Sequence, residues 1–284
     1  MCAWRQAKKD AMRIGVLMDY IEQEHGKKFI LVSLTAPNVK GEALEAEITR
    51  YNKAFFKMVN RKKFKKINKG YIRKLEITYN GEPLITHDMW HGLGRYHNKP
   101  MADYFERRGL KIGDENPNYD TYHTHFHVVF AVNRGYFSGQ SYIKWETWLN
   151  EWRDVMADQT ITQVDVRKFE KINKKGKKGE LVNELAKYAA KDSDYTISQA
   201  VFDVFYKALK GRQVLTYNGL FAEANKKYKA KELEHYKSAD DTQYSHMLMC
   251  YWRVTKYSIE NRRELTEKEK AEVNGVLLDE MEVD

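Results

Sequence analysis

The sequence YHTHFHVVFAV at residues 122–132 places three histidines at alternate positions and then runs into an apolar, β-branched segment. Successive side chains of a β-strand point to opposite faces, so His123, His125 and His127 are expected on one face of a strand. The apolar residues between and after them are expected on the other face, which suits burial. Neutral imidazoles that share a face are common ligands of a divalent metal ion. A strand whose solvent-exposed face happens to carry histidines is the alternative, but three alternating histidines among nine in the chain favour a metal site.

Length and charge set the general class of the protein. The chain has 284 residues and a formal net charge of +9, which favours polyanionic partners: nucleic acid first, an anionic membrane second. It contains no apolar run of 18 residues that would span a bilayer, and its N-terminal region has no apolar signal core. Two cysteines do not make a disulfide framework, which fits a reducing cytosol. We therefore expect a folded, basic, cytoplasmic protein.

Strands and helices alternate along most of the chain. Apolar residues at spacings of three and four predict helices at residues 1–25, 41–60, 142–156 and 180–191. Shorter β-rich runs predict strands at residues 29–35, 71–79, 122–132 and 161–166. Each of these patterns fits an α+β fold, in which an antiparallel sheet carries helices on one face and the catalytic site on the other. A change in character near residue 200 separates this part from a mainly helical C-terminal region, 201–284, with helical stretches expected at 202–209 and 217–236.

A third metal ligand is expected on a neighbouring strand. Glu76 lies on the polar face of the predicted strand at residues 71–79, and its carboxylate would reach the same ion if that strand pairs with the histidine strand. With His125 and His127 this gives two imidazoles and one hard oxygen ligand, which suits Mg²⁺ or Mn²⁺. The alternatives for the third position are His123, His91 and His97, and a solvated strand carboxylate is the non-functional interpretation of Glu76.

A second group of polar residues falls on the predicted helix at residues 180–191. Residues four apart lie on one face of a helix, so Glu184 and Tyr188 are neighbours and Lys191 extends the same surface. A phenol beside a metal-polarised phosphodiester is a possible nucleophile that attacks phosphorus and forms a phosphotyrosine. A carboxylate one turn away is able to activate water for the release of that bond. Glu and Tyr at this spacing also occur on ordinary surface helices, which is the alternative interpretation.

Two lysine-rich clusters precede and follow the histidine strand in the sequence. Their charge suits neutralisation of DNA phosphates, and solvated charge on a loop is the alternative for each. The candidate DNA-binding residues in the two clusters are Arg61, Lys62, Lys63, Lys65, Lys66, Lys174, Lys175, Lys177 and Lys178.

The motif His125-Phe126-His127, followed by Glu184-x-x-x-Tyr188-x-x-Lys191, resembles the HUH endonucleases. More narrowly, it is similar to the rolling-circle replication initiators (Rep proteins) of small bacterial plasmids. The segments ILVSLTAPN at residues 30–38, RKLEITYN at 73–80 and ITQVDV at 161–166 also resemble segments of that family. Together the similar segments cover most of residues 1–220.

This resemblance implies an enzyme that nicks one DNA strand at a plasmid double-strand origin. The enzyme would remain attached to the 5′ phosphate through Tyr188 and leave a 3′-OH for a polymerase. His125 and His127 would bind the metal, Lys191 would belong to the catalytic motif, and Glu184 would serve termination by hydrolysis. Residues 1–200 would form the HUH-type nicking domain, and residues 201–284 would bind DNA or mediate oligomerisation. The expected partners are plasmid origin DNA, a host helicase and the replication machinery.

Two other classes of function remain open at this point. One is a metal-dependent hydrolase that uses a metal-bound water, for which Tyr188 would be dispensable. The other is a non-catalytic protein that binds the origin and carries degenerate motifs. Covalent attachment to DNA distinguishes the nicking enzyme from both of them.

Overall fold

A computed structural model describes residues 3–96, 100–168, 197–237, 245–253 and 256–273 of the chain. The main sheet has five strands in the order β4-β1-β3-β2-β5, and each neighbouring pair is antiparallel. The strand that carries the histidines, β3, therefore lies in the centre of the sheet. The strands are β1 (Lys27–Thr35), β2 (Gly70–Asn80), β3 (Thr121–Asn133), β4 (Val164–Lys168) and β5 (Leu215–Gly219).

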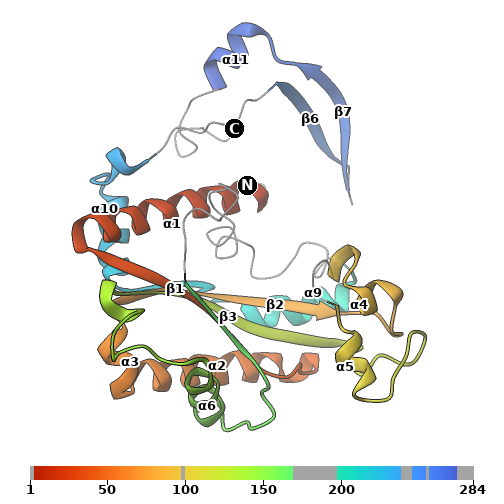
Figure 1. Cartoon of the computed structure of the whole chain (residues 1–284). Coiled ribbons are helices and arrows are strands. Elements are labelled where there is room, and N and C mark those ends of the chain that lie inside the picture. Colours follow the sequence, from red (N-terminus) through yellow and green to blue (C-terminus); the bar gives the residue numbers. More distant parts are fainter. Residues whose placement is uncertain (1–2, 97–99, 169–196, 238–244, 254–255, 274–284) are drawn as a thin grey trace.

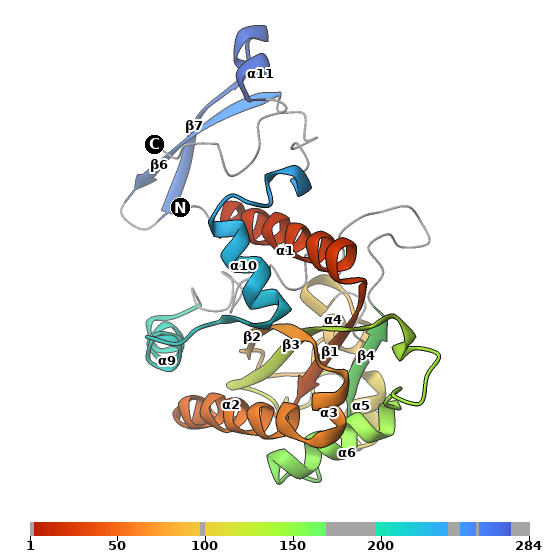
Figure 2. The same cartoon turned by 90° about the vertical axis from the view of Figure 1, so that its left-hand side faces the viewer.

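Helices lie on both sides of this sheet (Figure 1). In both views α2, α3 and α6 lie on one side, and α1 and α10 lie on the other (Figure 2). The α-helices are α1 (Ala3–His25), α2 (Leu44–Asn60), α3 (Lys62–Ile67), α4 (His87–His91), α5 (Ala102–Glu106), α6 (Trp145–Met156), α9 (Gln199–Leu209), α10 (Leu220–Lys229) and α11 (Glu267–Val273). Short 3₁₀ helices are η1 (Gly41–Ala43), η2 (Gly94–Tyr96), η3 (Arg134–Tyr136) and η4 (Glu234–Tyr236). The predicted antiparallel α+β architecture is thus confirmed.

The first face of the sheet packs against α2 and α6. Alternate residues of β3, among them Phe126 and Phe130, are buried in one cluster with Tyr51 and Phe55 of α2. Trp148 and Trp152 of α6 are completely buried in the same cluster. Aromatic side chains bury large apolar areas, so this cluster is the main source of hydrophobic stabilisation for the sheet.

The second face of the sheet is apolar over part of its area. Val129 and Ala131 of β3 lie on this face and form a second buried cluster with side chains of α1 and α10. The other members from the sheet are Phe29, Leu31 and Ile72, and those from the two helices include Ile14, Leu17, Phe221 and Ala224. Helices therefore cover part of the second face as well, because the alternate positions that begin with histidine in β3 continue as valine and alanine.

The chain after residue 200 combines helices with strands. Strand β5 pairs with β2 and so belongs to the main sheet, while β6 (His246–Arg253) and β7 (Lys256–Glu264) form a separate antiparallel hairpin. The helix expected from residue 217 begins at Leu220, because residues 215–219 form β5 instead. Gly219 and Gly70 allow this pairing: a Cβ on Gly219 would lie 2.7 Å from the Lys69 carbonyl oxygen, and both glycines have positive φ.

None of the helices in the described ranges is long and apolar enough to cross a membrane.

Candidate metal centre

The register of the central strands brings the candidate ligands to one place. Glu76 of β2 lies opposite His125 of β3, and Ser33 of β1 lies opposite His127 on the other side. Directly paired residues of an antiparallel ladder point to the same face, so these four side chains share the second face of the sheet. They lie beside the apolar cluster that contains Val129, two residues further along β3.

Three of these side chains form a compact group of ligand atoms. The Glu76 Oε2 atom lies 2.9 Å from His127 Nε2 and 3.3 Å from His125 Nε2. One ligand atom from each of Glu76, His125 and His127 lies within 4.8 Å of the other two, and within the described residues no other group of three meets this criterion. The structure therefore brings together the three residues that the sequence singled out.

The other histidines considered for the third position lie outside this group. His123 shares the face of His125, with 5.2 Å between the ring centres, but the three-residue group does not include it. His91 lies on α4, where its ring centre is 4.3 Å from that of His87. His97 lies outside the described residues.

The carboxylate of Glu76 is charged and nearly buried. Only 7% of Glu76 is exposed, and burial by itself would raise its pKa. Hydrogen bonds and electrostatic attraction from the rings of His125 and His127 outweigh burial and hold the pKa of the Glu76 carboxyl well below its usual range. The deprotonated form is the form that ligates a metal, so this environment keeps Glu76 ready to act as a ligand.

Ser33 supports His127 from the neighbouring strand. Its Oγ atom lies 3.0 Å from Nδ1 of His127, the ring nitrogen that does not face Glu76. A hydrogen bond at Nδ1 fixes the ring orientation and leaves Nε2 directed at the carboxylate. Sequence reasoning did not assign this role to Ser33. The signal was its position, since Phe29, Leu31 and Ser33 alternate in the strand and only the last is polar.

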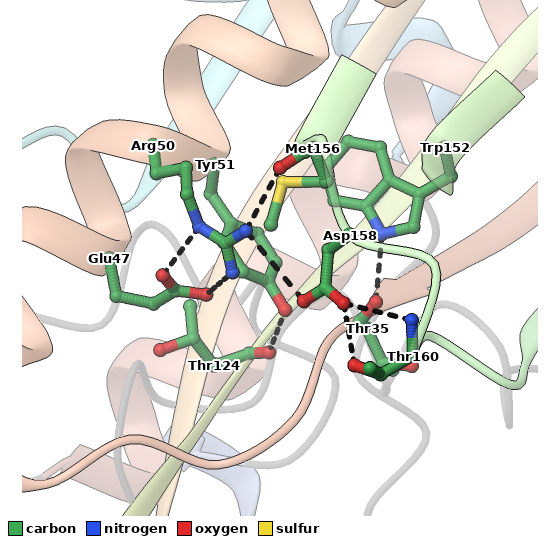
Figure 3. Close-up of polar contacts among 9 residues, drawn as sticks. All are labelled: Thr35, Glu47, Arg50, Tyr51, Thr124, Trp152, Met156, Asp158 and Thr160. Atoms are coloured by element: carbon green, nitrogen blue, oxygen red, sulfur yellow. Dashed lines mark hydrogen bonds and ion pairs between the residues drawn. The ribbon is translucent and has the colours of Figure 1, made fainter. Parts of the chain in front are cut away.

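Two buried side chains donate hydrogen bonds to the backbone next to the ligand His125, and Figure 3 shows both contacts. The hydroxyl of Tyr51 donates to the carbonyl oxygen of Thr124 at 2.6 Å, and the indole of Trp152 donates to that of Thr35 at 2.7 Å. Thr124 precedes His125, and Thr35 pairs with His125 across the ladder. Helices α2 and α6 therefore position the ends of β1 and β3 that surround this histidine.

A second set of contacts in Figure 3 joins α2 to the chain after α6. Arg50 donates to both carboxylate oxygens of Glu47 at 2.7 Å and to the carbonyl oxygen of Met156 at 3.0 Å. Its guanidinium also lies 3.8 Å from the carboxylate of Asp158. The two bonds to Glu47 fix the guanidinium of Arg50 on α2. Its bond to Met156 then links α2 to α6, the helices that carry Tyr51 and Trp152.

The donor set of the group is compatible with a divalent metal ion. Two imidazole nitrogens and one carboxylate oxygen combine ligands preferred by transition metals with a ligand preferred by Mg²⁺ and Mn²⁺. The three ligand atoms lie close enough together to share one ion. The ionised carboxylate of Glu76 supplies the negative charge that a cation requires. Glu76, His125 and His127 are thus able to hold a metal ion.

The predicted catalytic helix lies outside the described residues. This applies to Tyr188, Glu184 and Lys191, and equally to the lysines at 174, 175, 177 and 178. The described chain ends at Lys168 of β4 on one side of this segment and resumes shortly before α9 on the other.

The first lysine-rich cluster forms α3, which lies on the side of the sheet with α2 and α6 (Figure 1). Phe64 and Ile67 of this helix are buried, and this explains why a segment of such high charge is helical. Arg61 pairs with Glu151 at 2.5 Å and with Asp154, and Lys63 also pairs with Glu151. Acidic residues of α6 therefore offset part of the charge of the cluster. Lys62, Lys65 and Lys66 are exposed, and their contact with DNA stays a prediction.

Fold and site together define an α+β protein that presents a His-His-Glu group on one face of an antiparallel sheet. Comparison with known sequences gives the family: the model of a family described as "Replication protein" matches residues 1–264, and the chain belongs to that family. The family predicted from the sequence motifs is thereby confirmed.

Several curated relatives are called "Protein rep". One from Staphylococcus aureus is 41% identical over 201 residues, which are 70% of this chain and 70% of the relative. One from Bacillus amyloliquefaciens is 30% identical over 82% of this chain and 64% of the relative. One from Streptococcus pneumoniae serotype 2 is 29% identical over 92% of this chain and 74% of the relative. No solved structure matches the chain.

Proposed function

We propose that this protein initiates rolling-circle replication of a plasmid by nicking one strand of the double-strand origin. The observation that carries the proposal is the group formed by Glu76, His125 and His127 in a member of the replication protein family. These residues would hold a divalent ion, Mg²⁺ or Mn²⁺. When bound, the ion would neutralise charge on a non-bridging oxygen of the scissile phosphate.

The nucleophile of the proposed reaction is Tyr188. Its phenolic oxygen attacks the phosphorus and forms a Tyr–O–P bond, while the bond from phosphorus to the 3′ oxygen breaks. The phenol loses its proton, and the leaving oxygen takes up a proton to become the 3′-OH that a polymerase extends. Lys191, one turn further on the predicted helix, stabilises the negative charge near the phosphate.

Termination would use Glu184. Its carboxylate accepts a proton from a water molecule, and the water oxygen attacks the phosphorus of the phosphotyrosine. The Tyr–O–P bond breaks, and the phenol of Tyr188 is regenerated with a free 5′ phosphate on the DNA. The enzyme would work with a host helicase and the replication machinery, which unwind and copy the nicked origin.

A covalent adduct is the decisive test. The full chain is incubated with Mn²⁺ and a labelled single-stranded oligonucleotide from the origin of the plasmid that encodes it, and the products are separated by denaturing electrophoresis. We expect a labelled protein–DNA adduct with the native chain and none with Tyr188→Phe, which keeps the ring but lacks the attacking oxygen. Tyr195→Phe is the matched control and is expected to form the adduct.

The outcomes separate the proposal from its rivals. An adduct formed by Tyr188→Phe would refute the assignment of the nucleophile. Metal-dependent cleavage without any adduct would indicate a hydrolase, and binding without cleavage would indicate a non-catalytic origin-binding protein.

We propose that the lysine-rich clusters contact DNA, because their positive charge suits neutralisation of phosphates. Neutralised phosphates release counterions, so each contact steepens the dependence of affinity on salt. Replacing Lys62, Lys65 and Lys66 with glutamine is expected to flatten the plot of log affinity against log salt concentration by about 0.7–0.9 per lost contact. An unchanged slope would show that α3 does not touch DNA.

A further inference from the structure

A cavity lies on the face of the sheet opposite to the metal ligands. Its volume is about 290 Å³, and its walls come from α2, β2, β3, β5 and the residues that precede β5. Arg73 and Leu75 of β2 line it, whereas Glu76, the next residue, points to the other face. The cavity is therefore separated from the metal centre by the thickness of the sheet, although the two sites share the strands β2 and β3.

One wall of the cavity is a partly buried arginine stacked on aromatic rings. The guanidinium carbon of Arg73 lies 4.3 Å from the ring centre of Phe126 and 5.0 Å from that of Phe55. Such stacking stabilises a cation and leaves its N–H groups directed along the plane of the fork. In the described part of the chain no carboxylate pairs with Arg73, and burial lowers its pKa, an effect that Tyr71 partly offsets.

A second arginine lies across the cavity. Arg212 donates to Thr49 Oγ1 at 3.1 Å and to the carbonyl oxygen of Glu45 at 3.3 Å, and these contacts fix its position over α2. The carboxylate of Glu45 is 3.7 Å away and is 53% exposed, so solvent screens this pair. Gln213, next in the chain, adds an amide to the same wall. Two guanidinium groups thus line one small cavity: among the described residues, Arg212 has an exposed carboxylate partner in Glu45, and Arg73 has none.

Burial of positive charge without a counter-ion is unfavourable, and a bound anion removes this cost. The planar fork of arginine matches the oxygens of phosphate, and two forks in one cavity match a group with three or four oxygens. The volume lies just below the range for small-molecule sites, about 300–1,000 Å³, which suits one phosphate ester rather than a length of polymer.

We propose that this cavity binds a phosphate group through Arg73 and Arg212. The phosphate belongs either to a small phosphate ester, such as a mononucleotide, or to the backbone of a bound DNA strand. This site is independent of the nicking chemistry proposed above, because it lies on the opposite face and uses none of the metal ligands.

Isothermal titration of the full chain in EDTA tests the proposal. The titrants are inorganic phosphate, a deoxynucleoside monophosphate and a short oligonucleotide without terminal phosphates. We expect saturable binding of phosphate or of the mononucleotide, weakened at least about tenfold by Arg73→Gln and by Arg212→Gln. The matched control is Lys207→Gln, which removes one positive charge from the exposed side of nearby α9 without touching the cavity.

The titrants also distinguish the two sources of phosphate. If the mononucleotide binds tightly and the oligonucleotide does not displace it, the ligand of the cavity is a free phosphate ester. Displacement by the oligonucleotide, together with a tenfold loss of oligonucleotide affinity in both arginine variants, identifies a backbone phosphate. Arg212 lies between α9 and β5 with 25% of its side chain exposed, so Arg212→Gln keeps the test valid if Arg73→Gln fails to fold. The proposal is overturned if neither phosphate nor oligonucleotide binding differs between Arg212→Gln and Lys207→Gln, or if no titrant binds.

Discussion

The second face of the sheet has two halves that differ in chemistry. The apolar half is formed by Phe29, Leu31, Ile72, Val129 and Ala131 and lies under α1 and α10. The polar half is formed by Ser33, Glu76, His125 and His127. Strand β3 runs through both halves, and its register with β1 and β2 continues without a shift. The metal centre therefore needs no irregularity of the backbone. It lies on the same regular strands as the apolar half and differs from it only in its side chains.

The two halves of this face differ in what they contribute: one to stability and the other to chemistry. Burial of the apolar half stabilises the fold in proportion to the area removed from water. The polar half contributes the metal ligands, the charge of Glu76 and hydrogen bonds. If the separation holds, substitutions in one half change the free energy of unfolding, and substitutions in the other change metal affinity.

The largest effect is expected from Phe221→Ala, which removes a side chain that covers the apolar half. Phe221 of α10 is completely buried, and its ring centre is 5.8 Å from that of Phe29. Loss of a buried phenylalanine costs about 3–5 kcal/mol of unfolding free energy, measured by urea denaturation. Phe202→Ala on α9, where the ring is 43% exposed, is the control and is expected to cost about 0.5 kcal/mol or less. Equal losses in both variants would mean that α10 does not cover the sheet as described.

The next effect is the loss of metal binding in His127→Ala. Removing an outer-shell partner typically lowers metal affinity 10–100-fold, so removing a direct ligand is expected to lower it by more than about 100-fold. The stabilisation of the native chain by Mn²⁺ in thermal unfolding would disappear accordingly. His123→Ala removes an imidazole from the same strand face outside the group and serves as the control. If both variants lose affinity equally, the ligand set is not the one assigned here.

A smaller effect is expected from Ser33→Ala. This substitution removes the contact at Nδ1 of His127 and leaves all three ligands in place. We expect metal affinity to fall about tenfold, with little change in the free energy of unfolding. Thr78→Ala is the control, because Thr78 of β2 pairs with His123 and lies on the same face of the sheet without contacting His127 Nδ1. Titration with Mn²⁺ measures the difference, and native affinity in Ser33→Ala would exclude a role for the serine in orienting the histidine.

The smallest effect is expected from Tyr51→Phe, which acts on the polar half from the buried face. The substitution removes the donor to the carbonyl oxygen of Thr124 and keeps the ring in the core. The expected loss is about 1 kcal/mol of unfolding free energy. Metal affinity is expected to fall less than in Ser33→Ala, since every ligand and its support remain. Tyr119→Phe, at an exposed tyrosine, is the control. A larger loss of metal affinity in Tyr51→Phe than in Ser33→Ala would contradict the expected order of these two effects.

Much of the polar half follows from the sequence, because its pattern is local. Alternation alone places His125 and His127 on one face, and Glu76 follows once the two strands pair. The pairing of Ser33 with His127 does not follow, since it depends on how residues 94 positions apart are aligned. The covering of the apolar half does not follow from the sequence either, because it brings together α1, near residue 3, and α10, which begins at residue 220.

Short and strongly charged segments are the other limit of sequence reasoning. Strand β5 has five residues, and Tyr217 within it fits a helical pattern equally well when only the neighbouring residues are considered. Only its pairing with β2 decides the matter. In the same way α3 is helical because Phe64 packs against Trp148, a contact that the surrounding lysines do not suggest.

Strand β5 also sets a limit on how far the chain can be shortened. It pairs with residues 70–74 of β2, so a fragment that ends at residue 200 would leave these backbone groups at an open edge of the sheet. An unpaired edge is a template for another chain, and the same cut would remove α10 and uncover the apolar half. Such a fragment is expected to self-associate, because the 11-residue β2 becomes the edge strand. A fragment that ends after α10 keeps the five-residue β5 at this edge, and a short edge strand offers less backbone for another chain to pair with. The stretch that follows the predicted nicking domain thus protects that domain from its own copies.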